Sequence, residues 1–207
     1  LESSCWKGIE RYGYVFKTSS YLLLVSCSLN AITINKKLYN KKSMEYYKEY
    51  KAEWDKLPSA NKKRIIEAVR TGEKYGMGFT LGATRFLENK GQKSTFDNKT
   101  SINTNNHGSY VTYDCGDFGI NTMTYLKTIN KETKSKSKHL QACKTLANNK
   151  ELNLKMAMSV YKYALDRYDD NMLVAWNYYN TGRANLINDR IYKVKGVIML
   201  LKKELDS

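Results

Sequence analysis

The amino-acid sequence predicts a mainly helical protein that carries one small β-hairpin or irregular lobe. Apolar and aromatic residues recur at steps of three and four in several separate segments, which is the period of an amphipathic helix. Proline occurs only once, at Pro58, so few positions interrupt a helix. Residues 92–112 differ from the rest, because they are rich in Ser, Thr, Asn and Lys and lack an apolar period.

The N-terminal segment, residues 1–58, is predicted to be a basic and aromatic-rich extension. Residues 36–57 have the helical period, and lysines cover most of the helix outside one aromatic face. The residues of that face are Tyr47, Tyr50, Trp54 and Leu57. We expect this face to pack on the protein's own domain rather than on a partner.

A shorter apolar segment lies nearer the N-terminus. Residues 21–27 read Tyr-Leu-Leu-Leu-Val-Ser-Cys and end in a pattern that resembles a lipoprotein processing box. Its apolar core is short for a signal segment, which favours a short buried helix or strand instead. No apolar run in the chain reaches the roughly 18 residues that a membrane span needs.

The main domain is predicted over residues 59–190. Ser59 can cap its first helix, whose apolar face includes Ile65 and Val69. Glycines interrupt the pattern over residues 72–78, and the next helix, residues 79–89, is predicted to end at Gly91. The polar residues 92–112 then suit a surface loop or small hairpin.

Five further helical segments follow, and residues 191–207, which overlap the last of them, are set apart as a basic C-terminal helix. The predicted helices are residues 121–126, 139–147, 152–168, 172–179 and 184–205. Gly182 is expected to end the fourth of them, because glycine readily adopts the left-handed conformation of a helix C-cap.

The chain is strongly basic, with 35 Lys and Arg against 20 Asp and Glu and a net charge of +15. Such a charge indicates an anionic partner, for which a bacterial wall and nucleic acid are the candidates, or lysine-rich faces that serve solubility alone. The Tyr- and Lys-rich helix at residues 36–57 is the only feature that suits nucleic acid, so we do not expect a nucleic-acid partner. We expect this helix and the C-terminal lysines to hold the protein on an anionic wall. Those lysines are Lys193, Lys195, Lys202 and Lys203.

The cysteines and histidines do not have the spacing of a metal site, so we predict neither a metal nor a cofactor. The cysteines are Cys5, Cys27, Cys115 and Cys143, and the histidines are His107 and His139. No Cys-x-x-Cys pair occurs, and neither histidine has a Cys, Asp or Glu at ligand spacing. An even number of cysteines permits disulfides but specifies neither their pairing nor the compartment.

Three blocks of sequence resemble the soluble lytic transglycosylases, a family of lysozyme-like proteins. Asn153 opens the block at residues 153–161, and residues 178–182 read Tyr-Tyr-Asn-Thr-Gly, similar to the Ala-Tyr-Asn-Ala-Gly of that family. Residues 116–121, Gly-Asp-Phe-Gly-Ile-Asn, resemble its Gly-Leu-Met-Gln-Ile-Asn block. The first block, residues 74–91, resembles the helix that ends in the family's catalytic Glu-Ser.

The resemblance covers roughly residues 60–190 and implies a lysozyme-like α+β fold. It also implies cleavage of the N-acetylmuramic acid to N-acetylglucosamine linkage of peptidoglycan. Glu88 stands at the position of the catalytic glutamate, whereas Asn89 replaces the serine and Gly119 replaces a glutamine that touches sugar. Burial beside Phe86 and Leu87 would raise the pKa of the Glu88 carboxyl, as a general acid requires.

The resemblance also implies the residues that bind substrate. Tyr179 would present its hydroxyl to the cleft, next to Asn180, and the Gly-Leu-Met-Gln-Ile-Asn block would supply further contacts. Those contacts correspond to Phe118, Gly119, Ile120 and Asn121. Asp97, Asp114 and Asp117 follow Glu88 where lysozyme-like proteins place a second acid, and each of them also suits a turn.

Three functions therefore remain open on the sequence. The first is a lytic transglycosylase with one carboxylate, and the second is a muramidase that hydrolyses the same bond with two. The third is an inactive wall-binding component of a phage particle or secretion machine. All three predict peptidoglycan strands as the partner, possible contacts with virion or secretion proteins, and a place in the cell envelope, the periplasm or a virion.

Overall fold

The computed structural model of the protein describes residues 36–96, 102–184 and 189–206. These residues form eight helices and one three-stranded antiparallel sheet, which confirms the predicted mainly helical class with a small β region. None of the described helices is long and apolar enough to cross a membrane. The predictions for residues 1–35 and for Asp97 lie outside the described residues.

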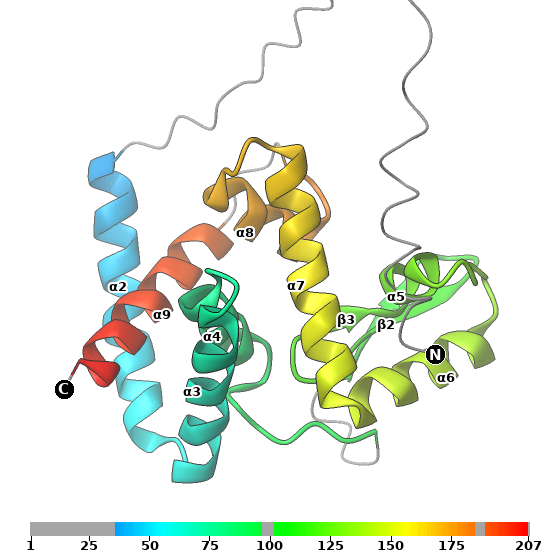
Figure 1. The fold of residues 1–207 in the computed structure, drawn as a ribbon, viewed down its shortest axis with the longest axis horizontal. Coiled ribbons are helices and arrows are strands. Elements are labelled where there is room, and N and C mark those ends of the chain that lie inside the picture. Colours follow the sequence, from blue (N-terminus) through cyan, green and yellow to red (C-terminus); the bar gives the residue numbers. More distant parts are fainter. Residues whose placement is uncertain (1–35, 97–101, 185–188, 207) are drawn as a thin grey trace, which may run out of the picture.

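Four helices from both halves of the chain pack into one group, on the left of Figure 1. They are α2 (Lys36–Lys56), α3 (Ser59–Glu73), α4 (Gly78–Asn89) and α9 (Arg190–Leu205). Tyr50 and Trp54 of α2 are buried, with ring centroids 5.3 and 6.4 Å from that of Phe86 in α4. Residues 36–56 of the predicted N-terminal extension and the C-terminal helix thus share one core with the segment between them.

Small residues allow these helices to approach closely. A side chain at Gly82 of α4 would meet Val69 of α3 and Leu201 of α9, and one at Gly196 of α9 would meet the backbone of α2. The Trp54 indole also donates a hydrogen bond of 2.7 Å to the Glu204 carboxylate, which ties α2 to α9. Close helix packing and this polar contact hold the group together.

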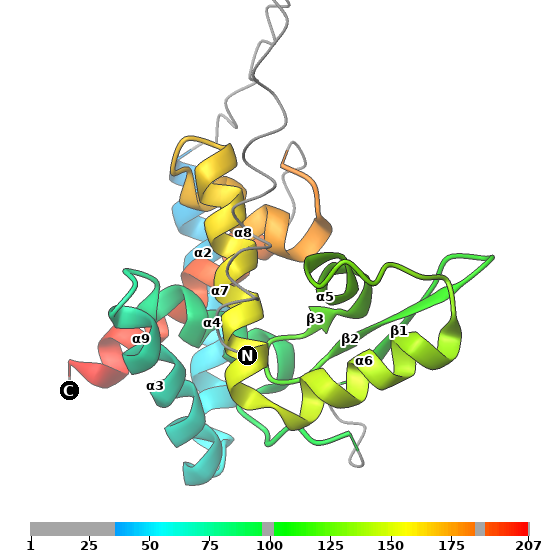
Figure 2. The same ribbon diagram turned by 45° about the vertical axis from the view of Figure 1, so that its right-hand side comes forward.

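The second part of the molecule contains the sheet and the other four helices, of which α7 runs between the sheet and the four-helix group (Figures 1 and 2). The strands are β1 (Ile102–Asn106), β2 (Val111–Cys115) and β3 (Ile120–Asn121), in the order β1-β2-β3. The helices are α5 (Thr122–Thr128), α6 (Lys136–Asn148), α7 (Lys150–Arg167) and α8 (Met172–Thr181). The helix α6 packs against β2, and α7 packs against α8.

The ends of the helices agree with the sequence at several positions and differ at two. Gly182 ends α8 in the left-handed conformation, with a φ of 67°, as predicted. Ser59 does not cap α3, because Pro58 occupies the N-cap position and Ser59 is the first helical residue. The helix α4 ends at Asn89, as predicted, but its C-cap is Lys90, with a φ of 54°, rather than Gly91.

The predicted hairpin is present, but the polar stretch around it is not wholly on the surface. The strands β1 and β2 pair from Ile102 with Cys115 to Asn106 with Val111. Ser94 and Thr112 are nevertheless buried, with 4% and 1% of their surface exposed. Their polar groups bond to other parts of the chain, which composition alone does not reveal: the Ser94 amide donates to Asp117 and Thr112 contacts Asn121.

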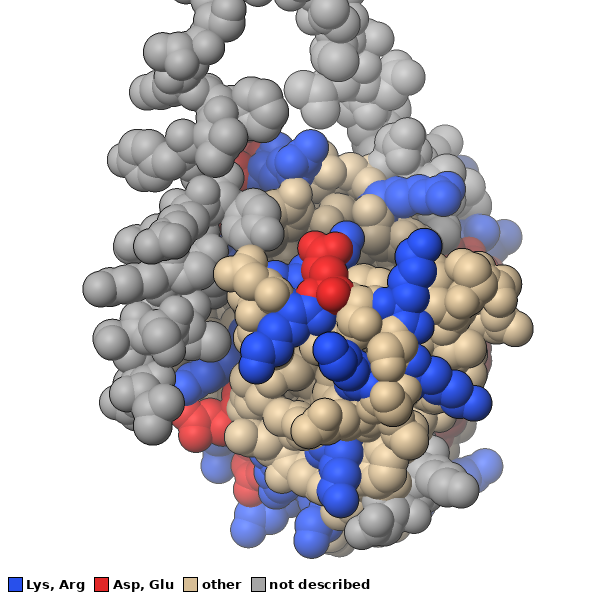
Figure 3. Space-filling model, turned by 90° about the vertical axis from the view of Figure 1, so that its right-hand side faces the viewer, with Lys and Arg blue, Asp and Glu red and all other residues tan. Residues whose placement is uncertain are grey.

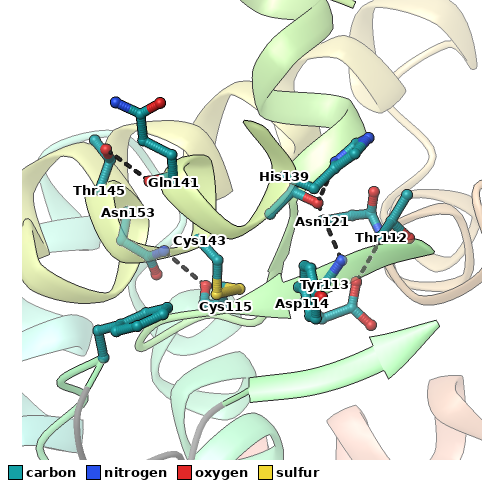
Figure 4. Close-up of a disulfide and its surroundings, with 12 residues drawn as sticks. Thr112, Tyr113, Asp114, Cys115, Asn121, His139, Gln141, Cys143, Thr145 and Asn153 are labelled. Atoms are coloured by element: carbon teal, nitrogen blue, oxygen red, sulfur yellow. Dashed lines mark hydrogen bonds between the residues drawn. A yellow bond between two sulfur atoms is a disulfide. The ribbon is translucent and has the colours of Figure 1, made fainter. Parts of the chain in front are cut away.

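A disulfide joins the sheet to α6. Cys115 at the end of β2 and Cys143 in α6 are bonded, with a sequence separation of 28 residues, and both are fully buried (Figure 4). This pairing resolves a choice that the sequence left open for two of its four cysteines. Cys5 and Cys27 lie outside the described residues.

We predict that the double variant Cys115→Ser/Cys143→Ser is less stable than the wild type by about 3–4 kcal/mol, because a loop of this length constrains the unfolded chain. Urea unfolding followed by circular dichroism measures the difference. Reducing agent should destabilise the wild type by a similar amount and leave the double variant unchanged. Equal stability of the oxidised wild type and the variant would contradict the prediction.

Candidate active site

Glu88 lies in the last turn of α4, where it meets the first residue of α9. The Arg190 guanidinium donates a hydrogen bond of 2.5 Å from Nη2 to Oε1 of Glu88. The side chains are 11% exposed for Arg190 and 21% for Glu88, so both are largely enclosed. Burial raises the pKa of Glu88 above its ordinary value, and the charge of Arg190 acts in the opposite direction.

Asp114 of β2 is the second carboxylate near Glu88. It accepts hydrogen bonds from the Asn121 amide at 2.7 Å and from the Asn105 amide at 2.8 Å, which hold it on one face of the sheet. The negative charge of Asp114 contributes to the raised pKa of Glu88. Two carboxylates, Glu88 on a helix and Asp114 on the sheet, are therefore close enough for their charges to interact.

The turn between β2 and β3 brings the backbone against Glu88. Gly116 and Gly119 both have positive φ angles, 83° and 61°, which residues other than glycine rarely adopt. A Cβ atom at Gly119 would lie 2.6 Å from Oε2 of Glu88, so any other residue here would collide with the carboxylate. Gly119, which replaces the glutamine of the resembled family, thus makes room for Glu88.

Asn153 of α7 holds this turn through two hydrogen bonds to its backbone. Its side chain is fully buried, accepts a hydrogen bond of 2.8 Å from the Phe118 amide and donates one of 2.9 Å to the Cys115 carbonyl (Figure 4). A side chain at Gly116 would overlap the Asn153 amide. The two hydrogen bonds hold the turn at Cys115 and at Phe118, so α7 fixes its position.

Tyr179 of α8 fastens the same turn from another side. Its hydroxyl donates a hydrogen bond of 2.7 Å to the Phe118 carbonyl, and its ring stacks on that of Tyr161 at 4.5 Å. The Tyr161 hydroxyl in turn lies 2.7 Å from that of Thr84 in α4. Helices α4, α7 and α8 are therefore connected through two stacked tyrosines beside Glu88.

The predicted substrate-binding residues take different places around this cluster. Phe118 and Ile120 are buried, with 4% and 2% exposed, so they belong to the core rather than to an open surface. Asn121 caps α5 by accepting a hydrogen bond of 2.9 Å from the Met123 amide and also holds Asp114. Asn180 is exposed.

Asp117, another candidate for the second acid, is committed elsewhere. It is buried, forms an ion pair with Arg85 and accepts a hydrogen bond of 3.3 Å from the Ser94 amide. Asn89, at the position of the family's serine, reaches the Gln92 carbonyl at 3.3 Å in the same loop. Both residues hold the chain that follows α4. Among the described aspartates, Asp114 is the one whose charge raises the pKa of Glu88.

Sequence reasoning missed Arg190 and Asn105. Arg190 lies 102 residues from Glu88, and no local pattern marks an arginine at the start of a helix as the partner of a distant carboxylate. Asn105 could have been inferred from the hairpin, because residues paired across two strands and their neighbours share a face.

The described residues contain no group of three or more His, Cys, Asp and Glu side chains that could hold a metal ion. His139 is buried and lies between the Thr122 hydroxyl and the Thr133 carbonyl, both at 2.9 Å. His107 lies 3.0 Å from the Thr112 hydroxyl. A comparison with protein-family models, curated proteins and solved structures finds no match to this chain.

The raised pKa of Glu88 predicts how stability depends on pH. The folded protein binds this proton more tightly than the unfolded chain, so the contribution of Glu88 to the free energy of unfolding falls as pH rises above about 4.5. Glu88→Gln does not titrate. The stability of the wild type minus that of this variant should therefore decrease with pH until Glu88 is ionised in the folded state.

Urea unfolding from pH 4 to pH 8 measures this difference. Glu132→Gln, which removes an exposed carboxylate from another part of the surface, is the control for a change of one charge. A stability difference between wild type and Glu88→Gln that rises with pH would show that Arg190 outweighs burial and that folding lowers the pKa of Glu88.

Proposed function

We propose that the protein is a lytic transglycosylase with a lysozyme-like fold that cleaves the N-acetylmuramic acid to N-acetylglucosamine linkage of peptidoglycan. The observation that carries this proposal is the meeting of three distant sequence blocks at one turn. Glu88 ends the first block, Gly119 and Phe118 belong to the second, and Asn153 and Tyr179 come from the third. A helical protein with a small antiparallel lobe is consistent with such a fold.

In this proposal Glu88 is the catalytic acid. It gives its proton to the glycosidic oxygen as the bond from that oxygen to C1 breaks. The carboxylate then takes a proton from the sugar's own 6-hydroxyl while that oxygen bonds to C1, which yields an anhydro sugar. A partly buried carboxyl with a raised pKa suits the first step, because its neutral form is favoured.

Arg190 has a positioning role in the same scheme. Its bond to Oε1 fixes the direction of the Glu88 side chain and favours the ionised form. Proton donation needs the neutral form, so substrate binding would have to loosen this ion pair. The carboxylate left after the first step is then stabilised by the same guanidinium.

A muramidase is the alternative that one observation favours. Asp114 lies on the sheet near Glu88, and two amides hold its carboxylate in place. Paired carboxylates on a helix and a sheet suit hydrolysis, in which the second carboxylate acts as nucleophile or activates water. If the protein is instead an inactive wall-binding component, neither the wild type nor the variants of Glu88 and Asp114 should cleave peptidoglycan.

The location and partners follow from the same argument. The Cys115–Cys143 disulfide supports an oxidising compartment, such as the bacterial envelope, or the outside of a virion. The helix at residues 36–57 supports nucleic acid less than its sequence suggested, because Tyr50 and Trp54 are buried against Phe86. Peptidoglycan strands are the proposed substrate, with virion or secretion proteins as possible neighbours.

Glu88→Gln should fold normally and lose about 10²-fold or more in cleavage of purified sacculi, because it cannot donate a carboxyl proton. Loss of turbidity gives the rate, and circular dichroism checks the fold. Mass spectrometry identifies the products: anhydro ends indicate a lyase and reducing ends a hydrolase. Cleavage by Glu88→Gln at the wild-type rate would exclude Glu88 as the acid.

Substitutions of the aspartates separate the two mechanisms. Asp114→Asn should retain appreciable activity in a one-carboxylate lyase and fall nearly as far as Glu88→Gln in a paired-carboxylate hydrolase. Asp97→Asn, outside the described residues, tests the remaining candidate in the same way. Asp117→Asn should instead unfold more easily, by about 3–5 kcal/mol, because it leaves Arg85 buried without its ion pair.

A further inference from the structure

A dense group of lysines covers the part of the surface formed by α5, α6 and the chain between them. Residues 127–144 contain one acidic residue, Glu132, and six exposed lysines. The lysines are Lys127, Lys131, Lys134, Lys136, Lys138 and Lys144. Figure 3 views this side of the molecule and shows blue side chains spread across it with few red ones. We call these six lysines the basic face.

The described residues do not neutralise the lysines of the basic face. None of the six forms an ion pair with a described residue, whereas Lys51, Lys90 and Lys155 on other surfaces each pair with a carboxylate. Lys134 contacts an aromatic ring, with its Nζ 5.9 Å from the centroid of Tyr110. Six cations close together repel one another, and this repulsion destabilises the folded state. Binding of an anionic ligand would reduce the repulsion.

The basic face lies behind the candidate active site rather than in it. Cys115 of β2 is bonded to Cys143 of α6, so that face of the sheet is covered by α6. Asp114, the preceding residue, points to the opposite face, because successive side chains of a strand alternate. A ligand on the outer side of α6 would therefore leave Glu88 and Asp114 accessible.

The chemistry of the basic face selects a flexible polyanion. All its cations are lysines, which bind phosphate as point charges and lack the planar fork with which arginine reads carboxylates and bases. Leu140 is the only large apolar side chain exposed within it, at 42%, which is too little to insert into a bilayer. Scattered peptide carboxylates would engage one or two lysines, whereas a repeating phosphate chain can engage several at once.

We propose that the basic face binds an anionic phosphodiester polymer attached to the bacterial wall. The identification of the polymer rests on the proposed function, which places the protein at peptidoglycan, and the disulfide beneath the face favours a compartment without nucleic acid. Binding there holds the enzyme on the wall while the other side of the sheet faces the glycan strand. The face adds affinity for intact walls and contributes nothing to the cleavage of free glycan fragments.

The test measures binding to sacculi by cosedimentation, with Glu88→Gln in every protein so that no wall is degraded. One variant replaces Lys131, Lys134, Lys138 and Lys144 with Gln. The matched control replaces Lys63, Arg70, Lys74 and Lys162 with Gln. These four exposed cations lie outside the basic face and outside the lysine-rich helices expected to contact the wall, so the control changes the charge equally. At about 0.05 M salt, the first variant should bind at least about tenfold more weakly than the parent and the control should bind like the parent.

Removing the phosphodiester polymers from the sacculi with hydrofluoric acid should weaken the parent to the level of the first variant. Equal binding to treated and untreated sacculi, or equal loss in both quadruple variants, would overturn the proposal. So would a loss in the first variant that appears only with double-stranded DNA or with anionic phospholipid vesicles. These results do not depend on cleavage, so an inactive protein would refute the proposed function and leave this binding test intact.

Discussion

The buried amide of Asn153 is the interaction on which the candidate site depends. With both of its hydrogen bonds it fixes the turn after β2, and the turn in turn sets where Gly119 and the Phe118 carbonyl lie. A side-chain amide satisfies one donor and one acceptor of the backbone at once, which an apolar residue at this buried position would leave unpaired. Glu88 and Tyr179 then meet a backbone that is already held in place.

Two enclosed ion pairs involve α4 residues that are three positions apart, and they have different consequences. Arg85 and Asp117 are both almost fully enclosed, and their pair organises the loop that follows the helix. Glu88 and Arg190 retain partial exposure, so their pair can exchange for contacts with a ligand. Burial is costly for any charge, and the difference in exposure is what separates a structural pair from one suited to chemistry.

The sheet divides the charges of the second part of the molecule. Its face toward Glu88 carries Asp114 and the amides of Asn105 and Asn121, whereas α6 covers the other face and presents lysines outward. The disulfide between Cys115 and Cys143 keeps these two layers together. The proposed glycan site and the proposed polyanion surface therefore lie on opposite faces of the sheet and would not compete for one ligand.

The sequence by itself determined the local features of this protein. The apolar periods located α2, α7 and α8, Gly182 ended a helix, and the polar composition of residues 92–112 indicated a hairpin, because these properties depend on near neighbours in the chain. Only the tertiary structure decided that Arg190 pairs with Glu88 and that Cys115 pairs with Cys143. It also decided that Asp117 pairs with the buried Arg85, whereas Asp114 lies near Glu88. Those pairings join residues that are distant in sequence, and packing of the whole chain selects them.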